Sequence, residues 1–420
     1  MSSEGSGGLN FRATFVSMVK IPYHLSDKRN VVISWKGSDS MVCPGAPKAL
    51  CILLLIAVLT FMCSAQTGTT PASKNQKALS RSGDFVYVSL DAEHSIAIYR
   101  IDSAQGDLGF IKKITVSGDP GSLSIDPSHK YLYAVIRSTN SIASFRINAR
   151  NGDLALINTI RAAGNPVYVG TDKTGRFLLT AYFADSKAAI YSIRQDGGVQ
   201  DSAVQVLATE KNAHAIQTDP SNRFLFIPCR TGETILQFTF DAGNGTVTPN
   251  VRDRTLTPPK TGPRHFVFHP ALNVVYVANE FGSSVTAYRL DQADGTLSEL
   301  QTISSLPADF AGTNTGADIH ITPDGRFLYA SNRGHESIAA FSVDGVTGRL
   351  TSIGSFPTEK TPRSFALDPS GKFLYAGVQG SGRIAAYRID QRDGHLTPIA
   401  TYDAGKSPVW ILTVRLFFKQ

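Results

Sequence analysis

The sequence predicts an all-β fold, a seven-bladed β-propeller built from four-stranded antiparallel blades. One sequence motif recurs along the chain. It usually begins with an aromatic residue, then Leu or Val, then Tyr, and a polar turn follows. The segments Ser-Ile-Ala-x-Phe/Tyr and Asp-Gly-x-Leu complete the motif. The copies start 46 to 53 residues apart, which is the period of one propeller blade. Their apolar or alternating segments are short and are separated by turn residues, as strands require. The seven copies begin at Phe85, Tyr131, Phe177, Phe224, Val274, Phe327 and Phe373.

The sixth copy shows the elements of one blade in order. Its first strand is short and innermost, and its second is apolar enough to lie between neighbouring sheets. Its third strand alternates, and its fourth forms the outer edge of the blade. Tight turns of Pro-Asp-Gly-Arg and Asp-Gly-Val-Thr-Gly join the strands in pairs. The expected elements are strand 318–321, turn 323–326, strand 327–331, loop 333–336, strand 337–343, turn 344–348 and strand 350–353.

The two ends of the repeat region are expected to complete one blade. The first copy, from Phe85, has no innermost strand ahead of it, whereas residues 407–414 resemble an innermost strand with no blade behind it. Pairing them closes the ring and removes an exposed sheet edge. We therefore predict a propeller over residues 84–416. WD40 and kelch repeats have similar periods, but the chain has no Trp-Asp dipeptide and no double glycine in successive blades.

The N-terminal part has the pattern of a secretory signal. Residues 50–61 form an apolar run, Lys48 precedes it, and Cys-Ser-Ala ends it at Ala65. Since signals begin near a start codon, we expect the true start at Met41, a signal peptide at 41–65, and a misassigned extension at 1–40. A polar linker follows at 66–83. The prediction is an exported protein, periplasmic or extracellular, without stable membrane insertion after cleavage; anchoring by the uncleaved apolar segment is the alternative.

Charge and cysteine content exclude several functions. The chain of 420 residues carries a net charge of +7, and removal of residues 1–65 leaves 35 basic and 31 acidic residues, or +4. This charge is too small to indicate a nucleic-acid partner. Cys229 is the one cysteine of the mature chain, so neither an internal disulfide nor a cysteine-pair metal site is expected.

Comparison of the seven copies separates framework from candidate functional residues. The end of the second strand and the start of the first lie at one rim of an antiparallel blade, around the channel mouth. Framework positions keep one residue type, but three columns at this rim do not. The columns hold Asp91, Arg137, Phe183, Arg230, Glu280, Arg333 and Gln379; Gly121, Val167, His214, Arg264, Ala317, Arg363 and Val409; and Ser122, Tyr168, Ala215, His265, Asp318, Ser364 and Trp410.

Imidazoles, carboxylates and guanidiniums gathered at one channel mouth suit an anionic substrate and acid–base chemistry. By contrast, residues that recur in the turn at the opposite rim are interpreted as solvated or turn-forming. These are the basic residues Lys130, Arg176, Arg223, Arg326 and Lys372 and the acidic residues Asp126, Asp172, Asp219 and Asp368.

The motifs of blades four to seven resemble those of the seven-bladed propeller lactonases. This family includes bacterial propeller-type 6-phosphogluconolactonases and the fungal carboxy-cis,cis-muconate lactonising enzyme. The resemblance covers residues 85–414. The motifs that carry it are Gly-Pro-Arg-His-Phe-Val-Phe-His-Pro at 262–270, Ala-Asn-Glu at 278–280, Ala-Asp-Ile-His-Ile-Thr-Pro-Asp-Gly-Arg-Phe-Leu-Tyr at 317–329, Asn-Arg at 332–333 and Pro-Arg-Ser-Phe at 362–365.

The resemblance implies hydrolysis of a sugar lactone in the central channel, with no cofactor and no metal. It places the catalytic residues at His214, Arg264, Glu280 and Arg333. Glu280 or His214 would be the general base, and Arg264 would stabilise the oxyanion. Arg333, with Arg363, would hold a carboxylate or phosphate of the substrate. The residues expected to bind the substrate are His265, Asp318, His320, Arg363 and Gln379.

Two other functions stay open at this point. A non-catalytic exported propeller could use the same rim to bind a ligand or a cell-envelope partner, because propellers host many functions. A metal-dependent lactonase of the six-bladed kind is disfavoured by the seven repeats and by the lack of an Asn/Asp/Glu cluster. The expected partner is a small anionic lactone, and the expected state is a monomer.

Overall fold

The computed structural model describes residues 23–27, 30–34, 40–44 and 81–418. The chain divides into two units, residues 1–77 and 78–420. The described residues of the first unit form an antiparallel sheet of β1 (Tyr23–Asp27), β2 (Asn30–Ser34) and β3 (Ser40–Pro44). Most of the predicted extension, signal peptide and linker, including the apolar run at 50–61, lies outside the described residues.

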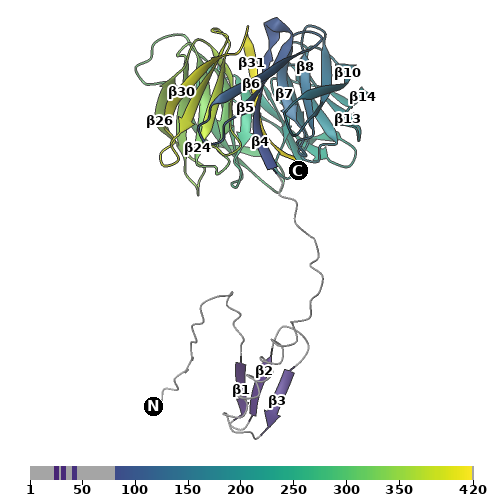
Figure 1. The fold of residues 1–420 in the computed structure, drawn as a ribbon, viewed down its shortest axis with the longest axis vertical. Helices are drawn as coiled ribbons and strands as arrows, with labels where there is room; N and C mark the ends of the chain where they lie inside the picture. Colours follow the sequence, from purple (N-terminus) through teal and green to yellow (C-terminus); the bar gives the residue numbers. More distant parts are fainter. Residues whose placement is uncertain (1–22, 28–29, 35–39, 45–80, 419–420) are drawn as a thin grey trace. The chain divides into compact units, whose positions relative to one another are not determined.

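The second unit is a seven-bladed propeller of four-stranded antiparallel sheets, which confirms the predicted fold (Figure 1). No helix in the described part of the chain is long and apolar enough to cross a membrane. Blade 1 consists of β31 (Pro408–Phe418), β4 (Arg81–Leu90), β5 (Ser95–Ile101) and β6 (Leu108–Thr115), and the 3-10 turn η1 (Asp91–Glu93) follows β4.

The other six blades follow in chain order, each built from four consecutive strands. Blade 2 has β7 (Pro120–Ile125), β8 (Tyr131–Ile136), β9 (Ser141–Ile147) and β10 (Leu154–Arg161); blade 3 has β11 (Tyr168–Thr171), β12 (Phe177–Tyr182), β13 (Lys187–Ile193) and β14 (Val199–Ala208); blade 4 has β15 (Gln217–Thr218), β16 (Phe224–Cys229), β17 (Thr234–Asp241) and β18 (Thr246–Leu256). Blade 5 has β19 (Pro263–Phe268), β20 (Val274–Asn279), β21 (Ser284–Leu290) and β22 (Leu297–Ser304); blade 6 has β23 (Thr315–Ile321), β24 (Phe327–Arg333), β25 (Ser337–Val343) and β26 (Leu350–Pro357); blade 7 has β27 (Pro362–Leu367), β28 (Phe373–Val378), β29 (Arg383–Ile389) and β30 (Leu396–Asp403).

The C-terminal strand closes the ring, as expected. In Figure 1 the yellow β31 lies beside the dark blue β4, and the pairing runs from Pro408 opposite Leu90 to Phe418 opposite Arg81. The two strands thus extend slightly beyond the predicted limits of 84 and 416. The Arg415 guanidinium donates from Nε and Nη2 to the Asp84 carboxylate at 2.7 and 2.8 Å. Closure therefore combines a backbone ladder with a bidentate ion pair.

The recurring turn between the third and fourth strands, with Gly after Asp, Asn, Gln or Thr, explains how neighbouring blades pack. Seven of its glycines have φ between 73° and 88°, a conformation that side chains disfavour. Each one touches the first residue of the preceding copy, and the first blade touches the seventh, so the contacts run around the whole ring. A Cβ on any of these glycines would collide with that residue. The pairs are Gly152–Phe85, Gly197–Tyr131, Gly245–Phe177, Gly295–Phe224, Gly348–Val274, Gly394–Phe327 and Gly106–Phe373.

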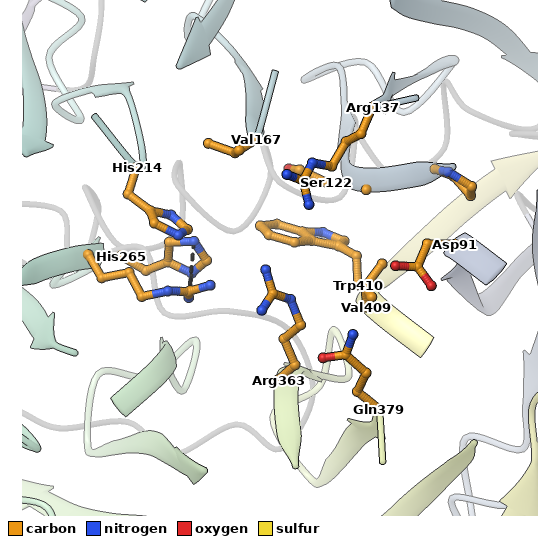
Figure 2. A pocket seen from close by; sticks show the side chains of 13 residues that line it. Asp91, Ser122, Arg137, Val167, His214, His265, Arg363, Gln379, Val409 and Trp410 are labelled. Carbon is orange, nitrogen blue, oxygen red and sulfur yellow. Dashed lines mark hydrogen bonds between the residues drawn. The ribbon is translucent and has the colours of Figure 1, made fainter. Parts of the chain in front are cut away.

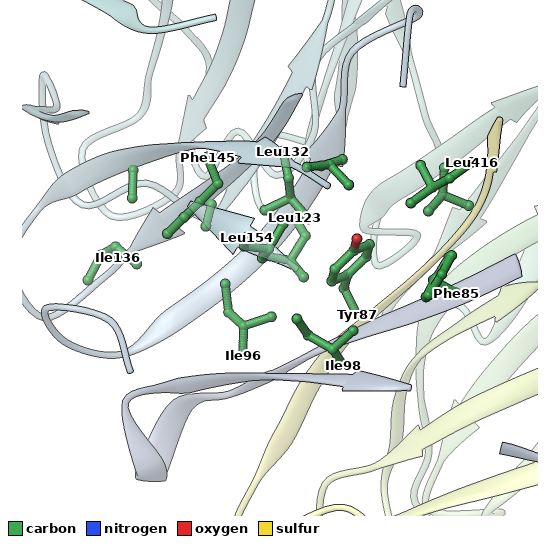
Figure 3. Packing of buried hydrophobic residues seen from close by; sticks show 14 residues of the cluster. Phe85, Tyr87, Ile96, Ile98, Leu123, Leu132, Ile136, Phe145, Leu154 and Leu416 are labelled. Atoms are coloured by element: carbon green, nitrogen blue, oxygen red, sulfur yellow. The ribbon is translucent and has the colours of Figure 1, made fainter. Parts of the chain in front are cut away.

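Apolar clusters fill the space between adjacent blades. Figure 3 shows the cluster between blades 1 and 2, where Tyr87 and Ile98 of one sheet face Leu123 and Leu132 of the next. The Tyr87 hydroxyl donates to the carbonyl of Gly152 at 2.7 Å, so this buried polar group is satisfied at the blade interface. The core is thus a ring of such interfaces around the channel.

The acidic residues at the opposite rim form turns, as predicted. The Asp172 carboxylate accepts hydrogen bonds from the backbone N–H groups of Arg176 and Phe177, each at 2.9 Å. The basic residues do more than face solvent. Arg223 donates to the carbonyl of Gln292 in the next blade at 2.6 Å and lies over the ring of Phe224. The turn therefore also ties neighbouring blades together.

Candidate active site

A cavity of about 150 Å³ lies at the channel end where the second strands finish; we call it the near cavity (Figure 2). Twelve of its 13 lining residues come from the three variable columns of the sequence repeats. Side chains from six blades therefore converge here, as the column comparison predicts. The lining consists of Asp91, Pro120, Gly121, Ser122, Arg137, Val167, His214, Arg264, His265, Arg363, Gln379, Val409 and Trp410.

β-Bulges explain why consecutive residues reach the same cavity. In a regular strand, neighbouring side chains point to opposite faces of the sheet. Arg264 and His265 nevertheless both line the near cavity, and the pairing of β19 with β20 shifts register between Pro263 and Phe266. The same irregularity opens the first strands of blades 1, 2, 6 and 7. Bulges redirect side chains in this way beside functional sites.

Glu280 lies behind the cavity wall and contacts three guanidiniums. Its Oε1 accepts a hydrogen bond from Arg230 at 2.6 Å and lies 3.3 Å from Arg333 Nη2. Its Oε2 lies 3.0 Å from Arg264 Nε, an ion pair that is not aligned as a hydrogen bond. Burial by itself would raise the pKa of Glu280, but the charges of the arginines outweigh burial and lower it. Glu280 is therefore a buried anion that organises positive charge.

Arg264 is the positive group at the centre of this network. Its Nη1 donates to the carbonyl of Ala317, and its side chain is almost fully buried. Burial, then the neighbouring Arg333 and Arg363, lower its pKa to about 9. Arg264 thus stays charged at neutral pH but lies in a site that would favour an added anion.

Arg230 is held in place by two aromatic rings. Its guanidinium lies 4.4 Å from the ring centroid of Phe183 and 4.9 Å from that of Phe281. These cation–π contacts from the loops of two neighbouring blades fix the group that donates to Glu280. The stack makes Arg230 a support for the cluster rather than a lining residue of the near cavity.

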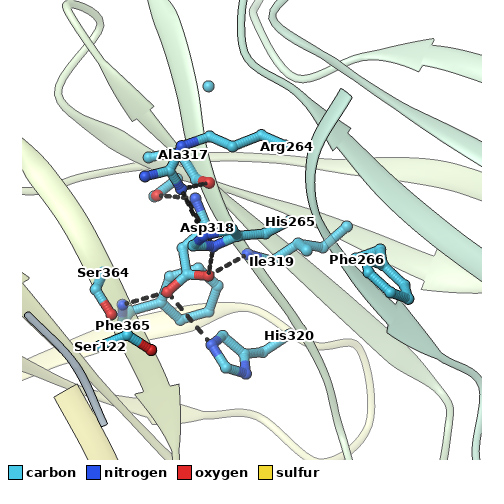
Figure 4. A network of polar contacts seen from close by, with 12 residues as sticks. Ser122, Arg264, His265, Phe266, Ala317, Asp318, Ile319, His320, Ser364 and Phe365 are labelled. Atoms are coloured by element: carbon cyan, nitrogen blue, oxygen red, sulfur yellow. Dashed lines mark hydrogen bonds and ion pairs between the residues drawn. The ribbon is translucent and has the colours of Figure 1, made fainter. Parts of the chain in front are cut away.

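His265 makes the shortest side-chain contact between a cavity-lining histidine and a carboxylate. Its Nδ1 lies 2.8 Å from Asp318 Oδ1, and both side chains are about 5% exposed (Figure 4). Asp318 also accepts from the backbone N–H of Ile319 at 3.1 Å and of Phe365 at 3.2 Å. Burial would raise the pKa of Asp318, but His320 and His265 hold it well below its usual range. Burial and then Arg264 lower the pKa of His265 to about 4.

His214 is also neutral but has a different environment. Its ring lies edge-on to those of Phe183 and His265, at centroid distances of 5.5 and 5.1 Å. Its Nδ1 is buried and has no hydrogen-bond partner in the described structure. Burial, with Arg264 as the next cause, holds the pKa of His214 well below its usual range.

Arg363 faces the near cavity without a protein counter-ion. Among the described residues, no acceptor lies within hydrogen-bond or ion-pair distance of its guanidinium, and Figure 2 shows it pointing toward the cavity centre. Burial lowers its pKa, followed by the effects of Arg333 and Arg137. Arg137 lines the same cavity and donates to Asn165 at 3.3 Å. The cavity therefore presents positive charge to whatever enters.

The contacting rings of Tyr168, His265 and Trp410, together with the Asp318 carboxylate bonded to His265, form what we call the septum. The septum separates the near cavity from a second space of about 590 Å³ at the other channel end, which we call the far cavity. Trp410 lines both cavities, and its ring contacts those of Tyr168 and His265 at centroid distances of 5.9 and 5.6 Å. Residues of the far cavity include Leu123, Ile125, Asp126, His129, Val169, Asp172, Lys173, His320, Leu367, Asp368, Ile411 and Arg415.

The structure brings together some of the residues named from the sequence and separates others. Glu280 and Arg333 lie behind the near cavity, Asp318 is enclosed in the septum, and His320 faces the far cavity. Trp410, Arg137 and Ser122 line the near cavity but were not singled out. Their signal was present, because all three stand in the variable columns. Those that line the near cavity as expected are His214, Arg264, His265, Arg363 and Gln379.

Within the described residues, no group of three or more His, Cys, Asp or Glu side chains is placed to hold a metal ion. The polar side chains that line the near cavity instead carry guanidiniums, imidazoles, one carboxylate, one amide, one hydroxyl and one indole N–H. Such a set can bind an anion, stabilise a developing oxyanion and move a proton.

The sequence of the propeller matches a known protein family. A family model described as "Lactonase, 7-bladed beta-propeller" matches residues 57–169 and 141–413. The 6-phosphogluconolactonase of Serratia proteamaculans is 35% identical over 186 residues, 44% of this chain and 56% of that protein. That of Photorhabdus laumondii is 39% identical over 176 residues, 42% and 52% of the two chains. The chain thus spans about half the length of the curated relatives it matches.

Solved structures show the same architecture along the whole ring. A periplasmic gluconolactonase of Pseudomonas aeruginosa superposes with a TM-score of 0.74 at 23% identity, over 80% of this chain and 100% of that one. A candidate 6-phosphogluconolactonase of Bacteroides fragilis superposes with a TM-score of 0.73 at 26% identity, over 82% and 100%. The first of these similarities concerns the fold alone.

Proposed function

Because this chain belongs to the seven-bladed β-propeller lactonase family, we propose that it hydrolyses a sugar lactone in the near cavity, and that the lactone carries an anionic group. One observation carries the proposal. The unpaired guanidinium of Arg363 faces the same small cavity as Arg264 and two neutral imidazoles. Relatives named 6-phosphogluconolactonase support this class of reaction.

Arg363 and Arg137 are the proposed binding groups for the anionic substituent, a phosphate or carboxylate. The Arg363 guanidinium has no acceptor among the described residues, and a planar guanidinium binds such groups with two parallel hydrogen bonds. The sequence suggested Arg333 together with Arg363 for this role, but Arg333 contacts Glu280 and donates to the carbonyl of Gly316 at 2.7 Å. Arg363 is therefore the better candidate.

Arg264 is the proposed oxyanion stabiliser. Attack of water forms a bond to the ring carbonyl carbon and turns its oxygen into an oxyanion. Collapse of this intermediate breaks the bond to the ring oxygen, which takes up a proton, and the new acid then ionises. Arg264 is held by Glu280 and Ala317, so its charge needs little reorganisation when the oxyanion forms.

The proton of the attacking water requires a base in the near cavity. Of the two residues that the sequence suggested, Glu280 or His214, only His214 lines the cavity. Glu280 contacts three arginines that lower its pKa, which makes it a weak base. We therefore assign the proton transfer to an imidazole, and we assign Glu280 to the positioning of Arg264.

The test is proton release by the purified chain on a panel of sugar lactones, measured above spontaneous hydrolysis. The panel pairs glucono-δ-lactone with its 6-phosphate, so that only the anionic group differs. We expect turnover with a higher kcat/KM for the phosphorylated lactone. A preference for the neutral lactone would overturn the anionic assignment. The absence of turnover on every lactone would overturn the enzyme and favour a propeller that binds a ligand.

We also propose that the chain is exported, with cleavage after Ala65. The apolar run at 50–61, preceded by Lys48, supports this proposal. N-terminal sequencing of the protein expressed in its host tests it. A chain that starts at Gln66 outside the cytoplasm is expected. An uncleaved membrane-bound chain would favour the anchored alternative, and an intact cytoplasmic chain would overturn export.

A further inference from the structure

We propose that His265 is the general base of the reaction and that Asp318 is the residue that positions it; this inference rests on the lactonase function proposed above. The resemblance to known lactonases places neither residue among the catalytic groups. Three features distinguish His265: its hydrogen bond to Asp318, the lack of such a bond at His214, and the contact of Asp318 with His320.

The Asp318 carboxylate fixes the tautomer of His265. Its Oδ1 lies 2.8 Å from His265 Nδ1, and backbone N–H groups of Ile319 and Phe365 also donate to it. These donors stabilise the ionised carboxylate, which then accepts the Nδ1 proton of the imidazole. The neutral ring therefore carries its proton on Nδ1 and has a lone pair on Nε2, which can take a substrate proton once Arg264 Nη1, 3.3 Å away, turns to the oxyanion.

His214 lacks such an orienting group. Its Nδ1 has no hydrogen-bond partner in the described structure, and its ring is packed against Phe183 and His265. Neither tautomer of His214 is selected, and no carboxylate stabilises its imidazolium. A base oriented by a hydrogen-bonded third group is the general pattern of activated water or hydroxyl attack. In the near cavity, His265 fits this pattern and His214 does not.

Arg264 links the strength of this base to the progress of the reaction. Its Nη1 lies 3.1 Å from His265 Nδ1 and 3.3 Å from His265 Nε2, and its charge is the next cause, after burial, that lowers the pKa of the imidazole. When an oxyanion forms beside Arg264, the new negative charge offsets that of the guanidinium. The imidazolium is then favoured, with Asp318 as its counter-ion. The base thus becomes stronger as the transition state is approached.

One imidazole can carry both proton transfers of the reaction. His265 Nε2 takes a proton from the attacking water as the new carbon–oxygen bond forms. The imidazolium then gives this proton to the ring oxygen as the ester bond breaks. Asp318 remains ionised throughout, in keeping with the role of the carboxylate in other Asp–His pairs. The net proton comes from ionisation of the product acid.

Asp318 is shared across the septum. Its Oδ2 lies 3.5 Å from Nε2 of His320, a side chain that is 38% exposed and faces the far cavity (Figure 4). His320 therefore competes with His265 for the negative charge of the Asp318 carboxylate. Replacement of His320 should strengthen the interaction of that charge with His265. Other titratable or charged groups that face the two cavities are His214, Arg264, Arg363, Arg137 and Asp91 on the near side, and His129, Lys173, Arg415, Asp126, Asp172 and Asp368 on the far side.

The decisive experiment compares Asp318→Asn with wild type and with Asp219→Asn on the lactone that wild type hydrolyses. Asp219 is a matched control because it is fully buried, accepts backbone hydrogen bonds and lines neither cavity. We expect Asp318→Asn to lower kcat by about 10²- to 10⁴-fold with KM within a few-fold. The acid limb of kcat/KM should move to lower pH, because Asp318 raises the pKa of His265.

A second variant and a second readout exclude a merely structural role. His320→Gln should move the same acid limb to higher pH, opposite to Asp318→Asn. Imidazole ¹⁵N NMR of the folded chain should show His265 protonated on Nδ1, with loss of this preference in Asp318→Asn. Wild-type kcat and pH profile in Asp318→Asn, or a His265 protonated on Nε2, would overturn the inference while the lactonase function stands. An inactive wild type would overturn both.

Discussion

Oε2 of Glu280 lies 3.0 Å from Nε of Arg264, and the same carboxylate also contacts Arg230 and Arg333. One buried anion thus holds three guanidiniums, of which only Arg264 lines the near cavity. Glu280 and Arg264 both stand in the variable columns of the sequence repeats, but the structure gives them different roles. Glu280 positions charge, and Arg264 presents it.

Replacement of Glu280 by Gln should abolish most activity without unfolding the ring. The amide keeps the size of the side chain, but three arginines lose their counter-ion and Arg264 loses its support. Loss of one oxyanion-stabilising group lowers kcat by about 10²- to 10³-fold. Steady-state kinetics and far-UV circular dichroism check the two parts. Wild-type rates in the variant would disprove the role of Glu280.

Arg363→Gln should raise KM for an anionic lactone more than it lowers kcat, because the lost contact is present in ground state and transition state alike. We expect at least a tenfold rise. Arg326→Gln is the control, since Arg326 is half-exposed in a turn at the opposite rim. An equal effect of both variants would indicate general electrostatics rather than a binding site.

Gly152→Ala should destabilise the propeller strongly. Gly152 has φ of 73°, and a Cβ there would lie 2.6 Å from Phe85. Left-handed backbone and overpacking together cost about 2–4 kcal/mol. Gly345→Ala is the matched control, because a Cβ at Gly345 meets no atom within 4 Å. Urea unfolding of both variants measures the difference; similar midpoints would contradict the interpretation of the blade contact.

Removal of residues 408–418 should open the ring. The deletion leaves β4 with an unpaired edge and Asp84 without the guanidinium of Arg415. We expect loss of cooperative unfolding in calorimetry, with recovery when a peptide of residues 407–420 is added. A truncated chain that melts like the parent would disprove the closure as a source of stability.

Stability should fall as the pH is lowered from about 6.5 to 4. The folded-state pKa values of His214 and His265 lie below the unfolded value of about 6.5, so the unfolded chain binds more protons in this window. For His265, with a folded pKa of about 4, the effect is about 3 kcal/mol. Urea unfolding at pH 7 and pH 4.5 measures it.

His265→Gln should flatten this pH dependence, because the variant removes one of the three buried imidazoles, His214, His265 and His269, whose pKa burial lowers. His395→Gln should not, since the His395 side chain is 54% exposed. A slope that is unchanged in His265→Gln would assign the acid sensitivity to other groups.

The sequence by itself determined the propeller, its seven blades and its closure. Each blade is specified locally, by short strands, a glycine turn and a first residue that is aromatic in six of the seven copies, and repetition makes these signals clear. It also determined which rim carries the variable residues, because strand direction alone decides which strand ends meet. The placement of His214, Arg264, His265, Arg363 and Gln379 at this rim was therefore predicted without coordinates.

Only the tertiary structure decided how deep each of these residues lies and what it contacts. Glu280 and Arg333 share a column with Asp91 and Gln379, yet they lie behind the cavity because arginines from three blades converge on one carboxylate. His320 faces the far cavity because it stands two residues after Asp318 along β23, on the far side of the septum. Depth and pairing depend on contacts between blades far apart in the chain, and no local pattern encodes them.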